Sequence, residues 1–424
     1  MAPGAALSVT LGRVLGDKVR GVRGVVPPGG NVFSAFVAQR KPSARARRRR
    51  LSSAPAFALA AALAAVLPIA ACTSAPASSG TSATAGARGT VRPAVTAAQA
   101  RQVFDRYVAA AAKAVSPQLA SPELSLVTGV EQAVLSATIA SHSIVMSNAQ
   151  GAYGSSLSVK PDFALYAYGS PTFYLPEAAG YPRFFVASVE RTLRGTDSTA
   201  AGAGGAQVPL EGPALMLFQQ ASAGAPWLLA SISQLPSGVT PPKLSTDSAG
   251  YVPTVPLSDA SLAAQPDDTG PLQAGVVDEG QASAATRAVA DGPLTTGMYQ
   301  GALNHAGGLT APHGDVYEWE LDGSSLPQFA LRTAAGGALV FYAMTLTTDV
   351  AVPDVINKAD PVRSGPPIQV PVGVQMLLPP GRPAPLVELS SSQTLSFAAV
   401  DPAAGNAKIQ VIAVGGGLTS ASAS

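Results

Sequence analysis

The sequence has little of what chemistry at a metal or cofactor usually needs. It contains one cysteine and three histidines in 424 residues, and only 12% of its residues are charged. A single cysteine cannot form an internal disulfide bond, and no spacing of the histidines matches a recognised metal motif. The sequence also lacks the Gly-x-Ser-x-Gly motif of many acyl-transfer enzymes and a glycine-rich phosphate loop between a strand and a helix. We therefore expect no cofactor and no metal, and no motif indicates an enzyme.

Positive charge is scarce over most of the chain. Eleven of the 27 lysines and arginines fall within residues 1–50, where Asp17 is the one acidic residue. From residue 51 onward, 16 basic residues face 24 acidic ones. Binding of nucleic acid relies on clustered lysines and arginines that neutralise phosphates. We therefore expect no nucleic acid partner.

No apolar run is long enough for an ordinary membrane-spanning helix. The densest run, Phe57–Ala71, has 15 residues and includes Pro68, whereas a spanning helix needs about 20. It follows the basic segment 41–50, "KPSARARRRR", and this order is typical of a signal peptide. The next residues, Ile69-Ala70-Ala71-Cys72, resemble the bacterial lipobox, although Ile leads it in place of the commoner Leu. The resemblance implies cleavage after Ala71 and lipidation of Cys72.

A lipidated Cys72 would hold the protein on the outer face of the cytoplasmic membrane. Two or three acyl chains together give stable anchoring, because each buried methylene contributes about 0.8 kcal/mol. Two alternatives remain. The segment Leu51–Ala71 could stay uncleaved as a signal anchor, or Cys72 could pack in a core as a small apolar side chain.

The composition divides the chain into six parts. We expect an over-extended, disordered N-terminus, because it fits no part of a signal peptide, with the true translation start further along the chain. After it come a signal peptide and a flexible tether that is poor in large apolar residues. Two folded domains follow, joined by a linker rich in Pro, Ser and Thr. The predicted bounds are 1–40 for the N-terminus, 41–72 for the signal peptide, 73–95 for the tether, 96–238 for the first domain, 239–257 for the linker and 258–424 for the second domain.

Hydrophobic spacing predicts helices first and strands afterwards in each half. Thr96 and Gln99 have the form of a capping box, and helical spacing follows to residue 115; further helix is expected within 122–149. The expected strands of the first half are 163–169, 172–175, 183–193, 214–221 and 227–235, and those of the second are 315–321, 328–334, 338–350, 394–400 and 408–414.

The second half repeats the plan of the first. Each long strand, 183–193 or 338–350, leads through a polar loop to a strand, 214–221 or 394–400, with which we expect it to pair antiparallel. Helices followed by a curved antiparallel sheet make an α+β plan. The arrangement is similar to the cystatin-like or nuclear-transport-factor-2-like cone, so we expect two tandem cone domains.

Alternation along the long strands decides which residues share a face. Phe185, Ala187 and Val189 share one face of the first strand, and Val340, Tyr342 and Met344 share one face of the second. Apolar residues also occupy part of the opposite faces, which predicts cover on both sides of the sheet.

The lipobox, the tether, the opening "ARQVFDRYV" and the strand "YPRFFV" together resemble an uncharacterised family of actinobacterial lipoproteins that carry a domain of unknown function. The resemblance covers roughly residues 45–424. It implies no known activity, cofactor or partner.

Few ionisable residues have a pattern typical of catalysis. His305 and His313, with Asp315, could supply metal ligands or a base with its orienting carboxylate, but their segment looks turn-rich, where exposed histidines are common. His142 lies in a helical stretch. Glu318 and Glu320 alternate along a strand, which predicts one solvated face rather than an acid pair.

Aromatic residues are the remaining candidates for a binding site, although plain core packing explains them as well. In a cone, some would line the concave face of the sheet. The predicted lining residues are Tyr166, Tyr168, Tyr174, Trp319 and Tyr342.

The first functional hypothesis is a non-enzymatic, lipid-anchored envelope protein that binds a small ligand or another envelope protein. The alternative is an isomerase or hydrolase that uses an acid such as Asp105 or Asp162 with a tyrosine in a cone pocket. A solute-binding protein of a transporter is a third possibility, disfavoured because such proteins alternate strands with helices.

Overall fold

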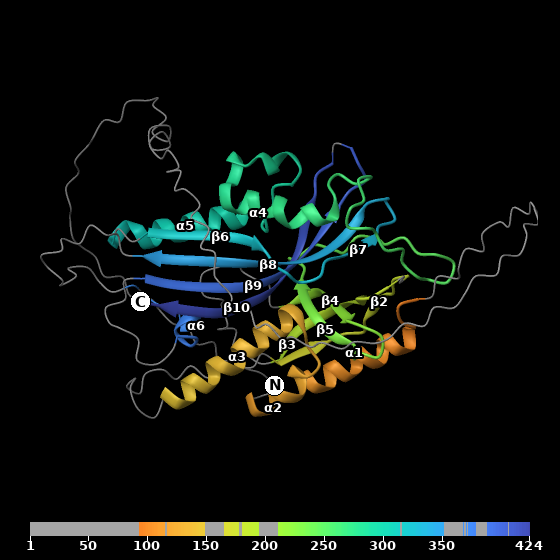
Figure 1. Ribbon diagram of the computed structural model, residues 1–424, viewed down its shortest axis with the longest axis horizontal. Helices are drawn as coiled ribbons and strands as arrows, with labels where there is room; N and C mark the ends of the chain where they lie inside the picture. Colours follow the sequence, from red (N-terminus) through yellow and green to blue (C-terminus); the bar gives the residue numbers. More distant parts are fainter. Residues whose placement is uncertain are drawn as a thin grey trace, which may run out of the picture. The chain divides into compact units, whose positions relative to one another are not determined.

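The structure is a computed structural model (Figure 1) that describes most of the chain from Pro93 onward. All described residues belong to one compact unit, Ala83–Ser424. The predicted N-terminus, signal peptide, cleavage residue Ala71 and lipidation residue Cys72 lie outside the described residues. The described ranges are 93–114, 117–148, 165–177, 180–194, 211–313, 316–351, 368, 370, 372–378, 388–405 and 407–424.

All ten predicted strands are present, and they form one ten-stranded sheet. The strands are β1 (Leu165–Tyr168), β2 (Thr172–Tyr174), β3 (Arg183–Arg194), β4 (Gly212–Gln220), β5 (Leu228–Gln234), β6 (Val316–Gly323), β7 (Phe329–Arg332), β8 (Ala338–Ala351), β9 (Glu388–Asp401) and β10 (Gln410–Ala423). Their order is β1-β3-β4-β5-β10-β9-β8-β6, with β2 paired to β3 and β7 paired to β8.

The strand pairing of the first half recurs in the second. As predicted, β3 pairs antiparallel with β4, and β8 with β9. The agreement extends to the short strands: β1 pairs with the end of β3 and β2 with its beginning, just as β6 pairs with the end of β8 and β7 with its beginning. Read from either edge, the sheet therefore has the same order of equivalent strands.

The two halves join where β5 pairs with β10, through Gln234 and Val414. Beside this pair lies the run Gly415–Gly417. A Cβ atom at Gly415 would overlap the carbonyl oxygen of Ile232, and Gly416 has a φ of +99°, which residues with a side chain rarely adopt. The glycines therefore let the last strands of the two halves approach each other.

Helices precede the strands of each half, except α6 (Val372–Gln375), which lies between β8 and β9. Thr96 forms the predicted capping box with Gln99, whose reciprocal hydrogen bonds satisfy free N–H groups at the helix start. None of the helices among the described residues is both long and apolar enough to cross a membrane. The helices are α1 (Ala97–Ala111), α2 (Pro117–Leu124), α3 (Gly129–Asn148), α4 (Thr269–Glu279), α5 (Thr296–His313) and α6 (Val372–Gln375), with short 3-10 turns at Pro266–Asp268, Gly280–Ala282 and Ala284–Arg287.

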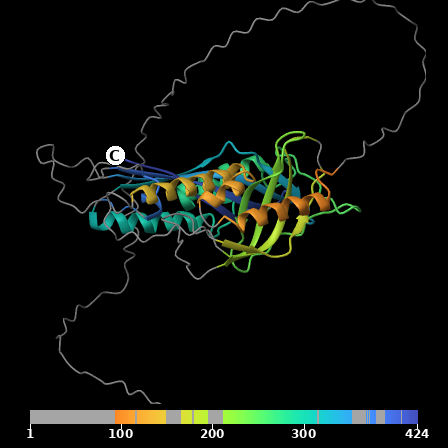
Figure 2. The same ribbon diagram turned by 90° about the horizontal axis from the view of Figure 1, so that it is seen from below.

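Helices cover one face of the strands in each half, and α3 reaches across the junction onto β10 and β9. In the first half, α1 lies on β3 and β4 (Figure 2), and Phe104 belongs to the same core as Phe185 and Phe218. In the second half, Val276 of α4 packs with Tyr342 of β8. The predicted helix-facing residues of both long strands are confirmed, because Phe185, Ala187 and Val189 lie in the first of these cores and Val340, Tyr342 and Met344 in the second.

The opposite faces of the two halves share a third core, which we call the central core. Phe184 of β3 packs against Phe329 of β7, with ring centroids 4.4 Å apart and the rings tilted by 31°, and Leu217 and Leu339 lie in the same cluster. Cover on both sides of the sheet was predicted from the apolar residues on both faces, and it is confirmed. The predicted linker 239–257 contributes Leu244 and Val252 to this core.

Several predicted bounds differ from the observed ones. The first helix ends at Ala111 rather than at residue 115, β9 begins at Glu388 and β10 continues to Ala423. β9 and β10 pair with each other over their whole lengths, so ladder hydrogen bonds hold glycine, serine and alanine residues of low strand propensity. Val95, placed in the tether by the sequence, is buried in the first-half core.

The fold is therefore α+β, with helices on a large antiparallel sheet. The separation into two cone domains is not confirmed, because one continuous sheet and one shared core connect the halves.

Candidate functional site

Ionisable side chains gather beneath the helices of the first half. We call them the polar cluster: Tyr107, Glu123, Glu131, Tyr166, Tyr168 and Arg191. Tyr107 is 4% exposed, and the other members keep part of their surface accessible to solvent. Water therefore reaches a group of charges that protein surrounds on most sides.

The strands set the positions of the arginine and two of the tyrosines. Tyr168 and Arg191 are directly opposite each other in the β1–β3 ladder, and Tyr166 lies two residues before Tyr168, on the same face. The Arg191 guanidinium lies over the Tyr166 ring, 3.5 Å from its centroid. Arg191 is an even number of residues from Phe185 along β3, so its side chain lies on the same, helix-covered face.

Glu131 joins the cluster from the first turn of α3. Its Oε1 atom accepts a hydrogen bond of 2.9 Å from the backbone N–H of Ile232 on β5. Burial raises the pKa of Glu131 to about 7, while Arg191 and this hydrogen bond act in the opposite direction. Near neutral pH this carboxyl group exists in both protonation states.

Glu123 and Tyr107 connect α2 to α1. The Tyr107 hydroxyl donates to Oε1 of Glu123 at 3.2 Å. Burial raises the pKa of both groups, and it raises the pKa of Tyr168 to about 12. Both tyrosine hydroxyls therefore stay protonated at neutral pH and can act as hydrogen-bond donors.

Arg191 has no close acid partner among the described residues, whose ion pairs are Arg101–Asp105 and Arg332–Asp259. Its Nε atom is buried and has no hydrogen-bond partner. A buried donor without an acceptor is costly. The cluster thus contains an arginine that is held by an aromatic ring and has no ion pair among the described residues.

Two of the five predicted lining residues, Tyr166 and Tyr168, belong to this cluster. Tyr174 packs on the opposite face, against the central core. Trp319 and Tyr342 lie in the second half, where Trp319 donates its ring N–H to the Val277 carbonyl at 3.1 Å and the Tyr342 hydroxyl donates to Gln273 at 2.8 Å. The structure therefore separates the predicted set into three places.

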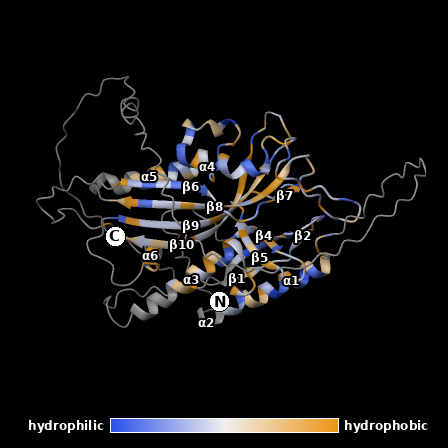
Figure 3. Ribbon diagram, in the orientation of Figure 1, coloured by the Kyte–Doolittle hydropathy of each residue, from blue (hydrophilic) through white to orange (hydrophobic). Residues whose placement is uncertain are grey.

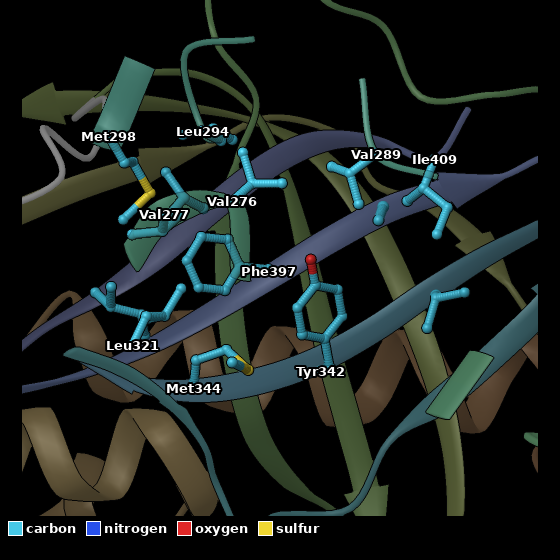
Figure 4. Close-up of a cluster of buried hydrophobic side chains, with 14 of the residues drawn as sticks. Val276, Val277, Val289, Leu294, Met298, Leu321, Tyr342, Met344, Phe397 and Ile409 are labelled. Atoms are coloured by element: carbon cyan, nitrogen blue, oxygen red, sulfur yellow. The ribbon is translucent and has the colours of Figure 1, made fainter. Parts of the chain in front are cut away.

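The second half has apolar packing where the first has the polar cluster. At the end of the β6–β8 ladder Gly323 is opposite Met344, a place that corresponds to Tyr168 opposite Arg191. Met344 is 1% exposed, and Figure 4 shows it within the apolar cluster of the second half. A cavity of about 30 Å³ lies instead beside the central core, where Leu217, Phe329 and Phe341 line it. The helix-covered face of the second half is thus filled by its own side chains.

The other predicted candidates do not join the cluster. Asp105 lies on the exposed side of α1 and pairs with Arg101 at 3.0 Å, so it is not a pocket acid; α1 shows both hydrophilic and hydrophobic residues along its length in Figure 3. Asp162 lies outside the described residues. Glu318 and Glu320 are both exposed, which confirms their solvated face.

The histidine segment is a helix rather than the expected turns, because α5 continues to His313. The His305 ring contacts the Tyr317 ring at 5.0 Å, while the side chains of His142 and His313, and Asp315 as a whole, are not among the parts that the structure describes. Within the described residues, no group of three or more metal-ligating side chains forms.

Sequence reasoning missed the charged members of the cluster. Glu131 is the one charged residue in the sequence of α3, and Arg191 continues the alternation of Phe185, Ala187 and Val189 on an apolar strand face. A charged residue that interrupts an otherwise apolar face was therefore the signal in the sequence that could have indicated these members of the cluster.

Comparison with known proteins identifies one family. Residues 91–423 match the family described as a domain of unknown function, DUF8094. No curated protein and no solved structure matched the chain. Because the match covers the whole of the described structure except its last residue, the chain belongs to the DUF8094 family.

Proposed function

We propose that the protein is a lipid-anchored extracytoplasmic protein that binds a small polar ligand without converting it. The anchor would be Cys72, exposed by cleavage after Ala71, and the protein would lie on the outer face of the cytoplasmic membrane. The basic segment 41–50, the short apolar run and the residues before Cys72 support this location.

The observation that carries the binding proposal is Arg191. Its guanidinium is held over the Tyr166 ring within the polar cluster, and no ion pair engages it among the described residues. Such a group is ready to bind an acceptor from a ligand without first breaking an ion pair. The tyrosine hydroxyls and carboxyl groups around it add directional contacts.

We further propose that each half derives from a cystatin-like or nuclear-transport-factor-2-like cone. The recurring strand order supports this relation. In this interpretation the first half retains a ligand-binding concave face, and the second half has filled its concave face with apolar side chains, including Met344 and Phe397.

Replacement of Cys72 tests the anchor. In Cys72→Ser the thiol that takes up the lipid is missing, so the mature protein should leave the membrane fraction and its N-terminus should carry no lipid. The folded part should be unchanged by circular dichroism. Unaltered processing and membrane retention in Cys72→Ser would disprove the anchor.

Native mass spectrometry of protein purified from envelope membranes tests ligand binding. We expect the wild-type protein to retain a small molecule, and Arg191→Gln to lose it. Arg183→Gln is the matched control, because Arg183 lies on the same strand and also stacks on a tyrosine, Tyr181, at 4.6 Å. A ligand kept by Arg191→Gln, or absent from the wild-type protein, would contradict the proposal.

One observation favours catalysis as a second candidate. Glu131, with a pKa raised to about 7 by burial, lies among tyrosines and could transfer a proton. An isomerase or hydrolase would then use Glu131 as its acid or base. In that case the recovered molecule would be converted by the wild-type protein and left unchanged by Glu131→Gln.

A further inference from the structure

We infer that the polar cluster selects a small zwitterion, a molecule with an ammonium and a carboxylate group a few bonds apart, as in an amino acid. The inference rests on the proposed ligand-binding function and names the class of ligand. It follows from the charges of both signs that the fold brings together without an ion pair between them among the described residues.

The carboxylate of the ligand would bind Arg191. The guanidinium group offers several N–H donors in one plane, and its pairing with a carboxylate is stronger than a neutral hydrogen bond. Tyr166 holds the group in place at 3.5 Å, so little freedom is lost on binding.

The ammonium of the ligand would bind Glu123 and Glu131. Burial opposes ionisation of both carboxyl groups, and neither has an ion pair within 4.0 Å among the described residues. A cation placed between them would favour their charged forms. The hydrogen bonds from Tyr107 and Ile232 each use only an Oε1 atom, which leaves further acceptor capacity on each group.

Aromatic rings lie beside the part of the site that would bind the ammonium group of the ligand. Tyr107 and Tyr168 meet edge to face with ring centroids 6.2 Å apart, and Phe104 lies 6.4 Å from Tyr168. Tyrosine and phenylalanine faces attract ammonium groups.

A ligand with one charge would leave half of the cluster unsatisfied. A simple carboxylate would satisfy Arg191 but approach two acidic groups, and a simple amine would satisfy the acids but approach the arginine. Like charges in one site repel each other. Only a molecule that carries both signs complements both sides of the cluster.

Isothermal titration of the wild-type protein with three matched probes tests this selection. Alanine carries both charges, propionate lacks the ammonium group and ethylamine lacks the carboxylate. We expect alanine to bind at least about tenfold more tightly than either of the others, the ratio that corresponds to loss of one charged contact. Equal or tighter binding of propionate or ethylamine would overturn the inference, as would absence of alanine binding up to about 10 mM.

Variants assign the two ends of the ligand. Arg191→Gln should abolish the preference for alanine over ethylamine, and the double variant Glu123→Gln, Glu131→Gln should abolish its preference over propionate. Arg183→Gln should retain both preferences, since Arg183 lies eight residues away along β3, about 26 Å at about 3.3 Å per residue. If a variant fails to fold, the three probes on the wild-type protein still decide the question.

The inference can fail while the proposed function stands. Envelope-purified protein that holds a small molecule through Arg191, but does not bind alanine, would keep ligand binding and overturn the zwitterion. Wild-type protein that retains no molecule and binds none of the probes would overturn both.

Discussion

At the scale of single residues, two influences compete at the Glu131 carboxyl group. Burial favours its neutral form and raises the pKa to about 7, whereas the hydrogen bond from the Ile232 N–H favours the charged form. Burial prevails. The folded protein therefore holds a proton at Glu131 over a pH range in which an unfolded glutamate has already lost it.

This competition predicts that Glu131→Gln stabilises the folded protein by an amount that depends on pH. As the pH rises from about 4.5 through 7, the free energy of unfolding should fall, because the folded state binds the extra proton. Glutamine stays neutral and can still accept from Ile232. The variant should thus be more stable than the wild type at pH 8, by up to about 3 kcal/mol and less to the extent that water reaches the group, with little difference at pH 5.

Urea unfolding at pH 5 and pH 8 measures this gain. Glu190→Gln is the control. Glu190 is an exposed glutamate next to Arg191 on β3, so its replacement should not give this difference between the two pH values. Equal effects of Glu131→Gln at the two pH values would show that Glu131 does not hold its proton in the folded protein.

The candidate site was only partly predictable because it depends on contacts between distant segments. Tyr166 and Tyr168 were found from the aromatic content of one strand. Glu123 and Glu131 come from helices whose positions over β1 and β3 no local pattern gives. The partnership of Arg191 with Tyr166 depends on the β1–β3 register, which the sequence of neither strand specifies alone.

At the scale of elements, the junction of β5 and β10 depends on glycine. Gly415→Ala should destabilise the protein by about 3 kcal/mol or more, because a Cβ atom there would overlap the Ile232 backbone. Gly323→Ala is the matched control, since it is a strand glycine with open space around its Cβ position. Thermal unfolding of both variants measures the difference, and similar midpoints would contradict the close approach.

The elements themselves were largely predictable. All ten strands were located, because apolar alternation and bounding turn residues are local signals. The errors fall where tertiary pairing overrides local preference. β10 continues through Gly415–Gly417 into a serine and alanine tail because β9 pairs with it, and α5 contains Gly307 and Gly308, which weaken a helical pattern.

At the scale of the whole molecule, the central core connects the halves, and they should unfold together. The two tryptophans report on them separately, since Trp227 packs in the first-half core and Trp319 in the second. We expect Trp227→Phe and Trp319→Phe to give coincident urea midpoints by fluorescence of the remaining tryptophan. Two separated transitions would show that the halves are independent domains.

A substitution in the central core should shift the unfolding transition that each of the two tryptophans reports. Phe329→Ala removes the ring that packs against Phe184 at 4.4 Å, which should destabilise the protein by about 3–5 kcal/mol. Both tryptophan signals should shift to lower urea by the same amount. A shift confined to Trp319 would contradict the coupling.

The pairing of β5 with β10 also has a consequence in time. During synthesis β5 emerges long before β10, with the whole second half between them, so its outer edge has no neighbour until the last strand arrives. An unpaired strand edge invites association with other chains. The β5 edge is therefore open to association for as long as β10 has not paired with it.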